Sequence, residues 1–551
     1  MTDPSQSQDT AQAMHLKISR IISNLGDNID LPANGVTCIV GANNVGKSQL
    51  LADIRRHIYA TPDGLPVVLS EVGTEPALPL IDPAFVGYGM GETGVPQRLL
   101  DLLLARAGAI WPDQAGTPQY TPKGGGQNAT ARQIQSSMSQ SRLDQIAAPW
   151  FITDNAIGSS VTAQFYNSMQ GTPDQDPSLM GMVVRSWEVE QQVSRIFEQG
   201  FDSELTLDTV SGGGFRIGLD DKSLLVGHRP TEAYRRQISQ LPKLSSQGQG
   251  VQAYMSLAVT ITLGDADIFI FDEPETYLHP PQARALGRLV GQQATDRGKQ
   301  VICVTHDKDF IIGLLESTCP LNFVRVSREG TGNRLHHVNT SLVKHVWTTA
   351  VLRYSNLLEG LFYRRVIVCE AEPDCRFYGA VLDGIVEDSE MSARAAEAIF
   401  LGASGKAGVP KRVEALASLG CDIKVILDVD ALCDGPSLLR RIAEALGREW
   451  KSEWTNWINT VSSAVSSEGV RPQLKLAGIN VMQSAPARIA AAALVDELSG
   501  VGIHVLATGV LESFYASSAQ EKERWVDEVL EAGLHKSLQA PRDFMKAVVT
   551  P

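Results

Sequence analysis

Short apolar runs alternate with helix-like segments in the first part of the chain, as is typical of parallel α/β sheets. An apolar run at residues 36–40 ends in a glycine and precedes a helix-like stretch from residue 47 to about residue 60. The same periodicity returns after residue 241, with a helix at 251–263, a strand at 267–271, a helix from about 282 and a strand at 300–304. We therefore expect a parallel α/β domain over residues 14–340.

A second series of the same kind follows a helix-like connector at residues 341–362. Its strands are predicted at residues 366–369, 398–401 and 423–427, and helix-like segments separate them. The chain thus predicts a second open α/β sheet within residues 363–551. The expected fold class is α/β throughout.

The pattern is weaker between residues 63 and 241, where helix-like segments occur at 97–107 and 180–199. Residues 115–140 are rich in Gly, Gln, Ser and Pro and have few apolar side chains to bury, so they predict a mobile piece. We expect a helical dimerisation insertion over about residues 90–205. Residues 1–13 are polar and without a basic or apolar signal region, which predicts a disordered tail.

Composition places the chain among cytoplasmic multidomain proteins. Its 551 residues are 43% hydrophobic and 20% charged, and no apolar run approaches the roughly 20 residues that span a membrane. A formal net charge of −14 argues against a protein wrapped in nucleic acid, although a local basic channel stays possible. Seven cysteines without a C-x-x-C pair indicate buried free thiols.

Residues 41–48, G-A-N-N-V-G-K-S, fit the phosphate-binding pattern G-x-x-x-x-G-K-[ST] between a strand and a helix. Glycines let backbone N–H groups surround phosphates, Lys47 offers a positive charge to the β and γ oxygens, and Ser48 can bind Mg²⁺. We expect ATP and Mg²⁺ as cofactors. The predicted nucleotide contacts in this segment are Gly41, Asn43, Asn44, Val45, Gly46, Lys47, Ser48 and Gln49.

The apolar run that ends at residue 271 is followed by Asp272 and Glu273. Asp272 is expected to hold Mg²⁺ and Glu273 to polarise the attacking water, because transfer of a γ-phosphate needs a metal clamp and a positioned nucleophile. His306 comes at the end of the next predicted strand and is a candidate sensor of the γ-phosphate. Together these residues predict ATP hydrolysis.

Two further segments carry a resemblance. Residues 244–250, L-S-S-Q-G-Q-G, and residues 272–280, D-E-P-E-T-Y-L-H-P, resemble the signature loop and the D-loop of the ABC branch that includes RecF-like and SMC-like ATPases. The resemblance implies that the signature loop of one subunit closes over the nucleotide of another, so it implies a homodimer or higher oligomer. The residues implied in this contact are Ser245 or Ser246 together with Gly248.

Acidic residues follow two strands of the second series. Glu370 comes directly after one strand, with Asp374 within one turn, and Asp428 and Asp430 form a D-x-D after another. Carboxyl ends of neighbouring parallel strands converge, and clustered carboxylates favour one or two Mg²⁺ or Mn²⁺ ions. Two metals roughly 4 Å apart would support phosphodiester cleavage. Acids that merely cap helices are the alternative.

The arrangement resembles the Toprim domain of topoisomerases, primases and related nucleases, in which such a glutamate and D-x-D bind the metal. The chain departs from that pattern at Ala371, where glycine is usual. A late G-V-L-E at residues 509–512 implies Glu512 as a further metal ligand. The loop at residues 402–406 would approach phosphate or be a flexible turn, and Lys536 would neutralise a transition state or be a surface lysine.

An ABC ATPase followed by a Toprim domain resembles the OLD (overcoming lysogenization defect) family, whose relatives include Gabija-type antiphage nucleases. The resemblance implies an oligomer whose ATP state controls metal-dependent cleavage of nucleic acid, DNA rather than RNA, in bacterial phage defence. It also implies a possible accessory defence protein and no membrane. Two alternatives stay open: a binding and signalling ATPase with a Toprim scaffold, and a triggered nuclease for RNA such as tRNA.

Overall fold

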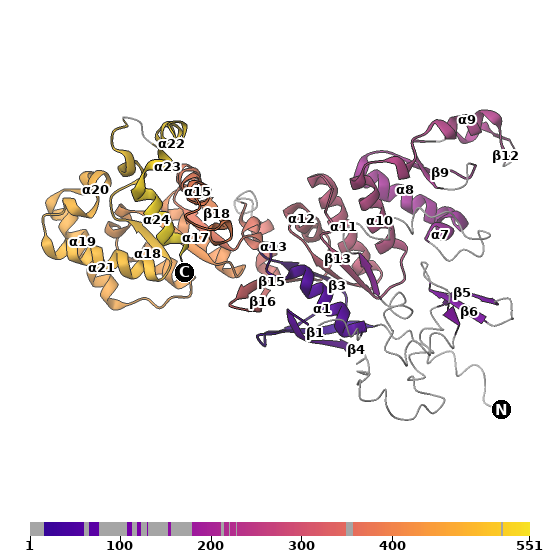
Figure 1. The fold of residues 1–551 in the computed structure, drawn as a ribbon, viewed down its shortest axis with the longest axis horizontal. Helices are drawn as coiled ribbons and strands as arrows, with labels where there is room; N and C mark the ends of the chain where they lie inside the picture. The colour runs from indigo at the N-terminus through magenta and orange to yellow at the C-terminus, as the bar shows by residue number, and fades with distance from the viewer. Residues whose placement is uncertain are drawn as a thin grey trace, which may run out of the picture. The chain divides into compact units, whose positions relative to one another are not determined.

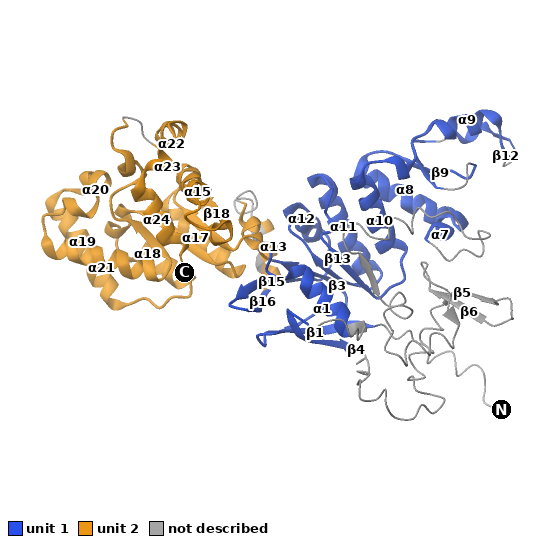
Figure 2. Ribbon diagram, in the orientation of Figure 1, with its two compact units in different colours: residues 1–40, 44–337 blue, residues 41–43, 338–551 orange. Residues whose placement is uncertain are grey.

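The computed structural model describes eight ranges, with side chains at all positions except 58, 59, 342, 345 and 346, and four short segments by their backbone. The eight are residues 16–59, 66–75, 179–210, 214–219, 221–226, 229–348, 356–518 and 522–550, and the four are 107–112, 118–122, 129–130 and 152–155. The chain divides into two compact units, residues 1–40 with 44–337 and residues 41–43 with 338–551 (Figure 2). The tail expected at residues 1–13 lies outside the described residues.

The first unit is built on a six-stranded sheet with the order β16-β15-β3-β14-β13-β8. Strands β15, β3, β14, β13 and β8 run parallel to one another. Asp272 pairs with Val304, and Val304 with Ile39, so the carboxyl ends of three central strands are level. The bounds are β3 Gly35–Val40, β8 Ile152–Asn155, β13 Ile268–Asp272, β14 Gln300–Val304, β15 Leu321–Glu329 and β16 Gly332–Val338.

The central strands are apolar because both faces of the sheet are covered. Strands β3 and β14 are buried along their whole length. Figure 1 shows α1 on one side of β3 and β13, and α10, α11 and α12 on the other. A small antiparallel sheet, β2-β1-β4, completes this part. The bounds are β1 Lys17–Ser23, β2 Asn28–Asp30, α1 Lys47–Tyr59, β4 Leu69–Glu75, α10 Gln249–Leu263, α11 Pro280–Asp296 and α12 Lys308–Glu316.

The expected helical insertion is corrected in part. Of the described residues between 90 and 205, only 179–185 and 187–201 are helical; β5, β6 and β7 form an antiparallel sheet, and β8 joins the main sheet beside β13. Residues 97–106 of one expected helix lie outside the described part, and residue 107 begins a strand. The mobile piece expected at 115–140 overlaps β6 and β7. The bounds are β5 Ala107–Pro112, β6 Pro118–Pro122 and β7 Ala129–Thr130.

The single helix expected at residues 180–199 is two helices, α7 Leu179–Arg185 and α8 Trp187–Phe201. Ser186 separates them because its side chain accepts a hydrogen bond from Val189 N and caps the second helix. Shorter elements lead from there to the main sheet. They are β9 Leu205–Leu207, β10 Phe215–Ile217, η3 Lys222–Leu224, β11 Leu225–Val226, β12 Arg229–Pro230, α9 Glu232–Gln240 and η4 Leu244–Ser246.

The second unit contains a four-stranded parallel sheet with the order β18-β17-β19-β20. The three expected strands are present, and β20 adds a fourth. The strand bounds are β17 Arg365–Cys369, β18 Ala398–Gly402, β19 Ile423–Asp428 and β20 Ile503–Leu506. The longer helices are α13 Thr340–Thr348, α15 Glu372–Glu387, α17 Val409–Ser418, α18 Pro436–Ala445, α19 Ser452–Glu468, α20 Arg471–Ala477, α21 Ala485–Gly500, α22 Lys522–Glu531 and α24 Gln539–Val549.

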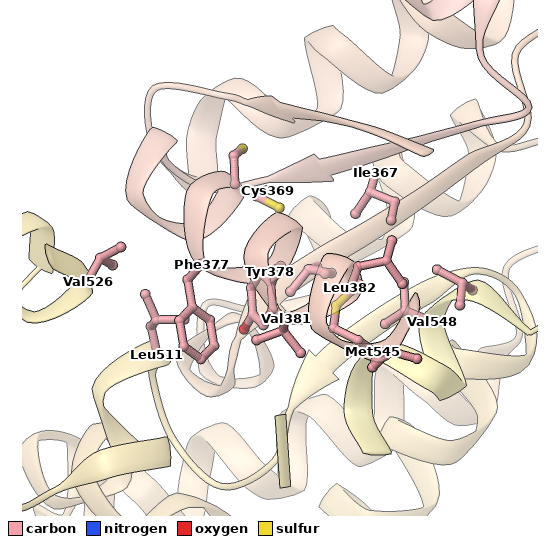
Figure 3. Close-up of a cluster of buried hydrophobic side chains, with 14 of the residues drawn as sticks. Ile367, Cys369, Phe377, Tyr378, Val381, Leu382, Leu511, Val526, Met545 and Val548 are labelled. Atoms are coloured by element: carbon pink, nitrogen blue, oxygen red, sulfur yellow. The ribbon is translucent and has the colours of Figure 1, made fainter. Parts of the chain in front are cut away.

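One face of this second sheet carries a large apolar core. Ile367 and Cys369, alternate residues of β17, pack there with side chains of α15, α22 and α24. Figure 3 shows Val381 and Leu382 of α15 beside Met545 of α24. The final helix is therefore part of the core, and the Arg365 Nη1 atom donates to the last carbonyl of α24 at 2.5 Å.

None of the described helices is long and apolar enough to cross a membrane. All seven cysteines carry free thiols, and six of them are buried, as expected.

Candidate functional sites

The phosphate-binding loop connects β3 to α1, as its motif predicts. Gly46 has φ +98°, a conformation that suits glycine, and a Cβ atom there would lie 3.0 Å from the Val68 Cγ2 atom. Lys47 is 5% exposed. Asn44 also has a positive φ, 59°. The loop therefore has the tight curvature that turns backbone N–H groups toward one point.

Ser48 and Asp272, the two expected Mg²⁺ ligands of the ATPase site, lie together. The Ser48 hydroxyl donates to the Asp272 Oδ1 atom at 3.2 Å. A hydroxyl and a carboxylate at the ends of adjacent elements are the donors that Mg²⁺ takes in such sites. Gln49, in contrast, donates to Asp53 Oδ1 within its own helix at 2.9 Å.

Glu273 and His306 also meet in this site. Glu273 has φ 47°, and its Oε1 atom is 3.4 Å from His306 Nε2. Burial, reinforced by Lys47, lowers the His306 pKa to about 4, so the imidazole is neutral at pH 7 and the contact is not an ion pair. Burial and then Asp272 raise the pKa of Glu273, while Lys47 opposes that rise. A neutral imidazole can orient the carboxylate without taking its charge.

The signature residues lie just before α10, Ser245 and Ser246 in η4 and Gly248 at the N-cap of α10. Ser245, Ser246 and Gly248 are exposed, and the Ser246 hydroxyl donates to Lys243 O at 2.7 Å. A Cβ atom on Gly250 would lie 2.4 Å from the carbonyl oxygen of Tyr277, so the first turn of α10 packs on the D-loop with no room for a side chain. The two resembling segments are thus in direct contact.

Two acidic strand ends of the second unit meet directly. Glu370 follows β17 and Asp428 ends β19, and the Glu370 Oε1 atom accepts a hydrogen bond from Asp428 N at 3.0 Å. The loop after β18 lies beside them, since Gly405 N donates to Glu370 O at 2.7 Å. A Cβ atom on Gly402 would come within 2.9 Å of Glu372 N. The predicted convergence of these strand ends is therefore observed.

Asp430, the second acid of the D-x-D, is 7% exposed and is held by lysines of the same unit. Lys406 Nζ lies 2.6 Å from its Oδ1 atom, and Lys475 Nζ lies 3.3 Å from its Oδ2 atom. Lys406 also contacts Asp434 Oδ2 at 2.7 Å, and Arg471 pairs with the other oxygen of Asp434. Sequence reasoning gave no role to this lysine network, whose members are far apart in the chain.

Asp374 and Glu512 complete the acidic neighbourhood. Asp374 Oδ2 accepts from Ala371 N at 2.9 Å and Glu512 Oε1 from Lys522 N at 2.7 Å. Burial raises the pKa of Asp374 to about 6, with Glu512 adding to the rise. Burial likewise raises the pKa of Asp428 to about 8, and four carboxylates contribute, namely Glu370, Asp374, Asp430 and Glu512.

The donor chemistry fits a hard divalent cation, because partly buried carboxylates whose pKa values are raised by burial and by their acidic neighbours are stabilised by positive charge. As placed, however, no three His, Cys, Asp or Glu side chains of the described residues form a group that could hold a metal ion. The hydrogen bond from Asp428 N and the lysines on Asp430 occupy oxygens that a cation would need. Lys536 does not contact these acids: its Nζ atom lies 2.6 Å from Glu387 Oε2, and its side chain is half exposed.

A pH dependence of stability follows from Asp428. Its folded pKa of about 8 exceeds the ordinary 3.8, so at pH 7 the metal-free folded protein keeps a proton that the unfolded chain releases. The free energy of unfolding in EDTA should therefore fall as pH rises from about 4 to about 8. Denaturant titrations across this range measure the slope. Asp428→Asn should flatten it, and an unchanged slope in that variant would contradict the assignment.

One family profile matches the chain. Residues 176–313 match the family described as "AAA domain, putative AbiEii toxin, Type IV TA system". The matched range contains Asp272, Glu273 and His306, and it follows the loop at residues 41–48. No protein of curated function matches the chain.

Solved structures with similarity include heads of SMC proteins. An SMC head bound to the C-winged helix domain of ScpA has 13% identity and a TM-score of 0.31, covering 60% of this chain and 99% of that one. The SMC head domain from Thermotoga maritima has 15% identity and a TM-score of 0.27, covering 59% of this chain and 100% of that one. A Pyrococcus furiosus Smc head with an extended coiled coil has 12% identity and a TM-score of 0.29, covering 60% of this chain and 98% of that one.

At these TM-scores the structural likeness assigns no function. The family match and the phosphate-binding loop both indicate an ATPase. The contact of Ser48 with Asp272 at the carboxyl end of β13 is consistent with them. The chain contains a P-loop ATPase domain of the AAA type.

Proposed function

We propose that the chain is an ATP-regulated, divalent-metal-dependent nuclease whose cutting site lies in the second unit. The observation that carries the proposal is the hydrogen bond of 3.0 Å between Asp428 N and Glu370 Oε1 at adjacent strand ends. It joins the acids that a Toprim site uses, in an all-parallel sheet on the same chain as an ATPase domain.

Glu370, Asp374, Asp428 and Glu512 would hold Mg²⁺ or Mn²⁺ there, with Asp430 once its lysines move. The cation would supply polarisation of a phosphodiester and activation of water. Lys406 and Lys475 bring positive charge to the same place, where a phosphate group would lie. The net charge of −14 belongs to the whole chain and leaves room for such a local basic site.

The ATPase unit would act as the control element. Exposed signature residues just before α10 support an ABC-type homodimer or higher oligomer in which Ser245 or Ser246 contacts the partner's nucleotide. We further propose that the substrate is DNA, that the protein acts in the cytoplasm, and that it serves bacterial phage defence with a possible accessory protein. These last features rest on the resemblance to the OLD family.

A cleavage panel tests the proposal. Supercoiled DNA, linear DNA and RNA are incubated with the protein in Mg²⁺, Mn²⁺ or EDTA, each with and without ATP. Cutting of DNA that needs the metal and changes with ATP is the expected result. Cutting of RNA alone would support the triggered RNA nuclease instead, and survival of every substrate would contradict the nuclease proposal.

A second candidate function is a binding and signalling ATPase whose second unit is a scaffold. The lysines on Asp430, and the lack of a ready metal group among the described residues, favour it. Mn²⁺ binding distinguishes the two functions, measured by calorimetry without nucleotide. A scaffold should show no Mn²⁺ affinity that depends on Asp428 and Asp430.

Lys406 gives a further prediction for the nuclease. Because the Lys406 Nζ atom contacts Asp430 in the metal-free protein, Lys406→Met should tighten Mn²⁺ binding about 5-fold, which corresponds to an ion pair worth about 1 kcal/mol. The same calorimetry measures this effect. Lys536→Met serves as the control, since Lys536 pairs with Glu387. Weaker binding in Lys406→Met would show that the lysine organises the acids rather than competing for them.

A further inference from the structure

Glu275 is a partly buried acid of the ATPase unit. It lies three residues after Asp272, in the segment that leaves β13, and its Oε1 atom accepts a hydrogen bond from the backbone N of His306 at 2.9 Å. His306 leaves the neighbouring strand β14. The bond thus ties the two segments together just beyond the last strand contact, where Glu273 N donates to Val304 O at 2.9 Å.

The hydrogen bond from Glu275 fixes the main chain of His306, whose ring contacts Glu273. His306 Nε2 is 3.4 Å from Glu273 Oε1, and a small rotation of the His306 backbone would separate these atoms. Glu273 itself has a positive φ of 47°, so both partners of the contact depend on the local main chain. Glu275 therefore acts on the site geometry without touching the reacting atoms.

A purely structural role explains Glu275 poorly. Its second oxygen, Oε2, is buried and has no hydrogen-bond partner among the described residues, a state that is unfavourable for a carboxylate. The start of α12 does not need it as a cap, because Asp307 already caps that helix and accepts from Phe310 N at 2.8 Å.

The segment that holds Glu275 also contacts the signature helix. Tyr277, two residues further on, has φ 71°, and its carbonyl oxygen is the atom against which Gly250 packs. Between the exposed signature loop and His306 lies one short stretch of chain, with Glu275 at its centre. The Glu275 carboxylate therefore lies where it can hold His306 at a fixed position relative to the signature loop.

We propose that Glu275 is a positioning residue for ATP hydrolysis, holding the His306 backbone where the imidazole contacts Glu273. This inference rests on the proposed roles of Glu273 and His306 in the ATPase site. Glutamine keeps an oxygen that can accept from His306 N, whereas alanine removes it. The two substitutions at Glu275 therefore separate the hydrogen bond from the charge.

Steady-state ATPase measurements test the role in the full chain. Glu275→Ala should lower kcat about 10-fold or more while KM for ATP changes by less than about twofold, because misplaced catalytic groups lower the rate and leave ground-state binding intact. Glu275→Gln should recover most of the rate. Circular dichroism and the thermal unfolding midpoint check the fold of each variant. A parent-like kcat in Glu275→Ala, or a Gln variant as slow as the Ala variant, would overturn the proposal.

A double-mutant cycle with His306→Ala isolates the pathway. If Glu275 acts through His306, Glu275→Ala should reduce kcat no further once His306 is alanine. Losses that multiply would show an independent or structural effect and would overturn the proposal. Parent-like activity in His306→Ala alone would instead remove the assigned role of the histidine. A slow His306→Ala beside a fast Glu275→Ala would refute only the positioning role.

Discussion

Glu273→Gln is expected to abolish ATP hydrolysis while ATP binding is retained. Glu273 directly follows Asp272, the last residue of β13, and its Oε1 atom lies 3.4 Å from His306 Nε2. An amide of the same shape cannot take a proton from the attacking water, and loss of such a group lowers rates by about 10²- to 10⁴-fold. The Ser48 and Asp272 pair stays intact, so Mg²⁺ and nucleotide should still bind. Phosphate release and equilibrium binding of a fluorescent ATP analogue measure the two properties.

Lys47→Ala provides the contrasting variant for that measurement. Its ammonium group is buried in the loop, and loss of a charge-assisted contact to phosphate should weaken nucleotide binding about 10- to 100-fold. Hydrolysis then falls because the substrate is not held. Unchanged turnover in Glu273→Gln would show that another residue is the catalytic base, and equal binding losses in both variants would point to misfolding of the site.

Asp428→Asn is expected to eliminate metal-dependent cleavage. Asp428 is central to the acidic neighbourhood, since Glu370, Asp374, Asp430 and Glu512 all raise its pKa. Removal of residues that only orient metal ligands lowers affinity or activity about 10- to 100-fold, so loss of a direct ligand should exceed about 100-fold. Cleavage of the best substrate from the panel, and Mn²⁺ binding by calorimetry, are the measurements. ATP turnover without DNA should be parent-like.

Asp383→Asn is the matched control, because Asp383 is an exposed aspartate of α15 in the same unit. It should cut at the parent rate. Equal cleavage by Asp428→Asn and the parent would place the nuclease site elsewhere or assign the activity to a contaminant. Loss of Mn²⁺ binding without loss of cleavage would separate the metal site from the cutting site.

Local sequence patterns predict the sheets well because buried parallel strands are short apolar runs with a marked end. Strand β14 matches the expected residues 300–304, and β3 begins one residue before the expected run. The phosphate-binding loop follows β3, and His306 lies shortly after β14. The same rule brought Glu370 and Asp428 together correctly, since both end strands that are neighbours in the sheet.

Long-range pairing explains most of what the sequence could not predict. Strand β8 joins β13 from more than a hundred residues away, and four residues at 152–155 give no sign of that partner. Lys475 reaches Asp430 from a helix outside the motif, so the D-x-D alone could not show that its second acid is neutralised. Glu275 stood inside a quoted motif, yet only its backbone partner, His306 N, gives it a role.

Local capping chemistry explains the misjudged helix boundary. Apolar periodicity continues across Ser186, so the pattern predicts one helix, but the Ser186 hydroxyl binds Val189 N and starts a new one. A serine directly before an apolar position, as Ser186 is before Trp187, is a known signal for the start of a helix. The nucleotide-binding loop shows the opposite case, because its motif already includes the strand and helix that flank it.

The position of α24 has a consequence for synthesis of the protein. Met545, Val548 and Val549 fill the core of the second unit, and Arg365 at the start of its first strand binds the carbonyl of Val549. The second sheet therefore lacks part of its core until residues 545–549 have been synthesised, whereas the described strands of the ATPase unit are complete by residue 338. During translation, the nucleotide-binding half can fold before the acidic site exists.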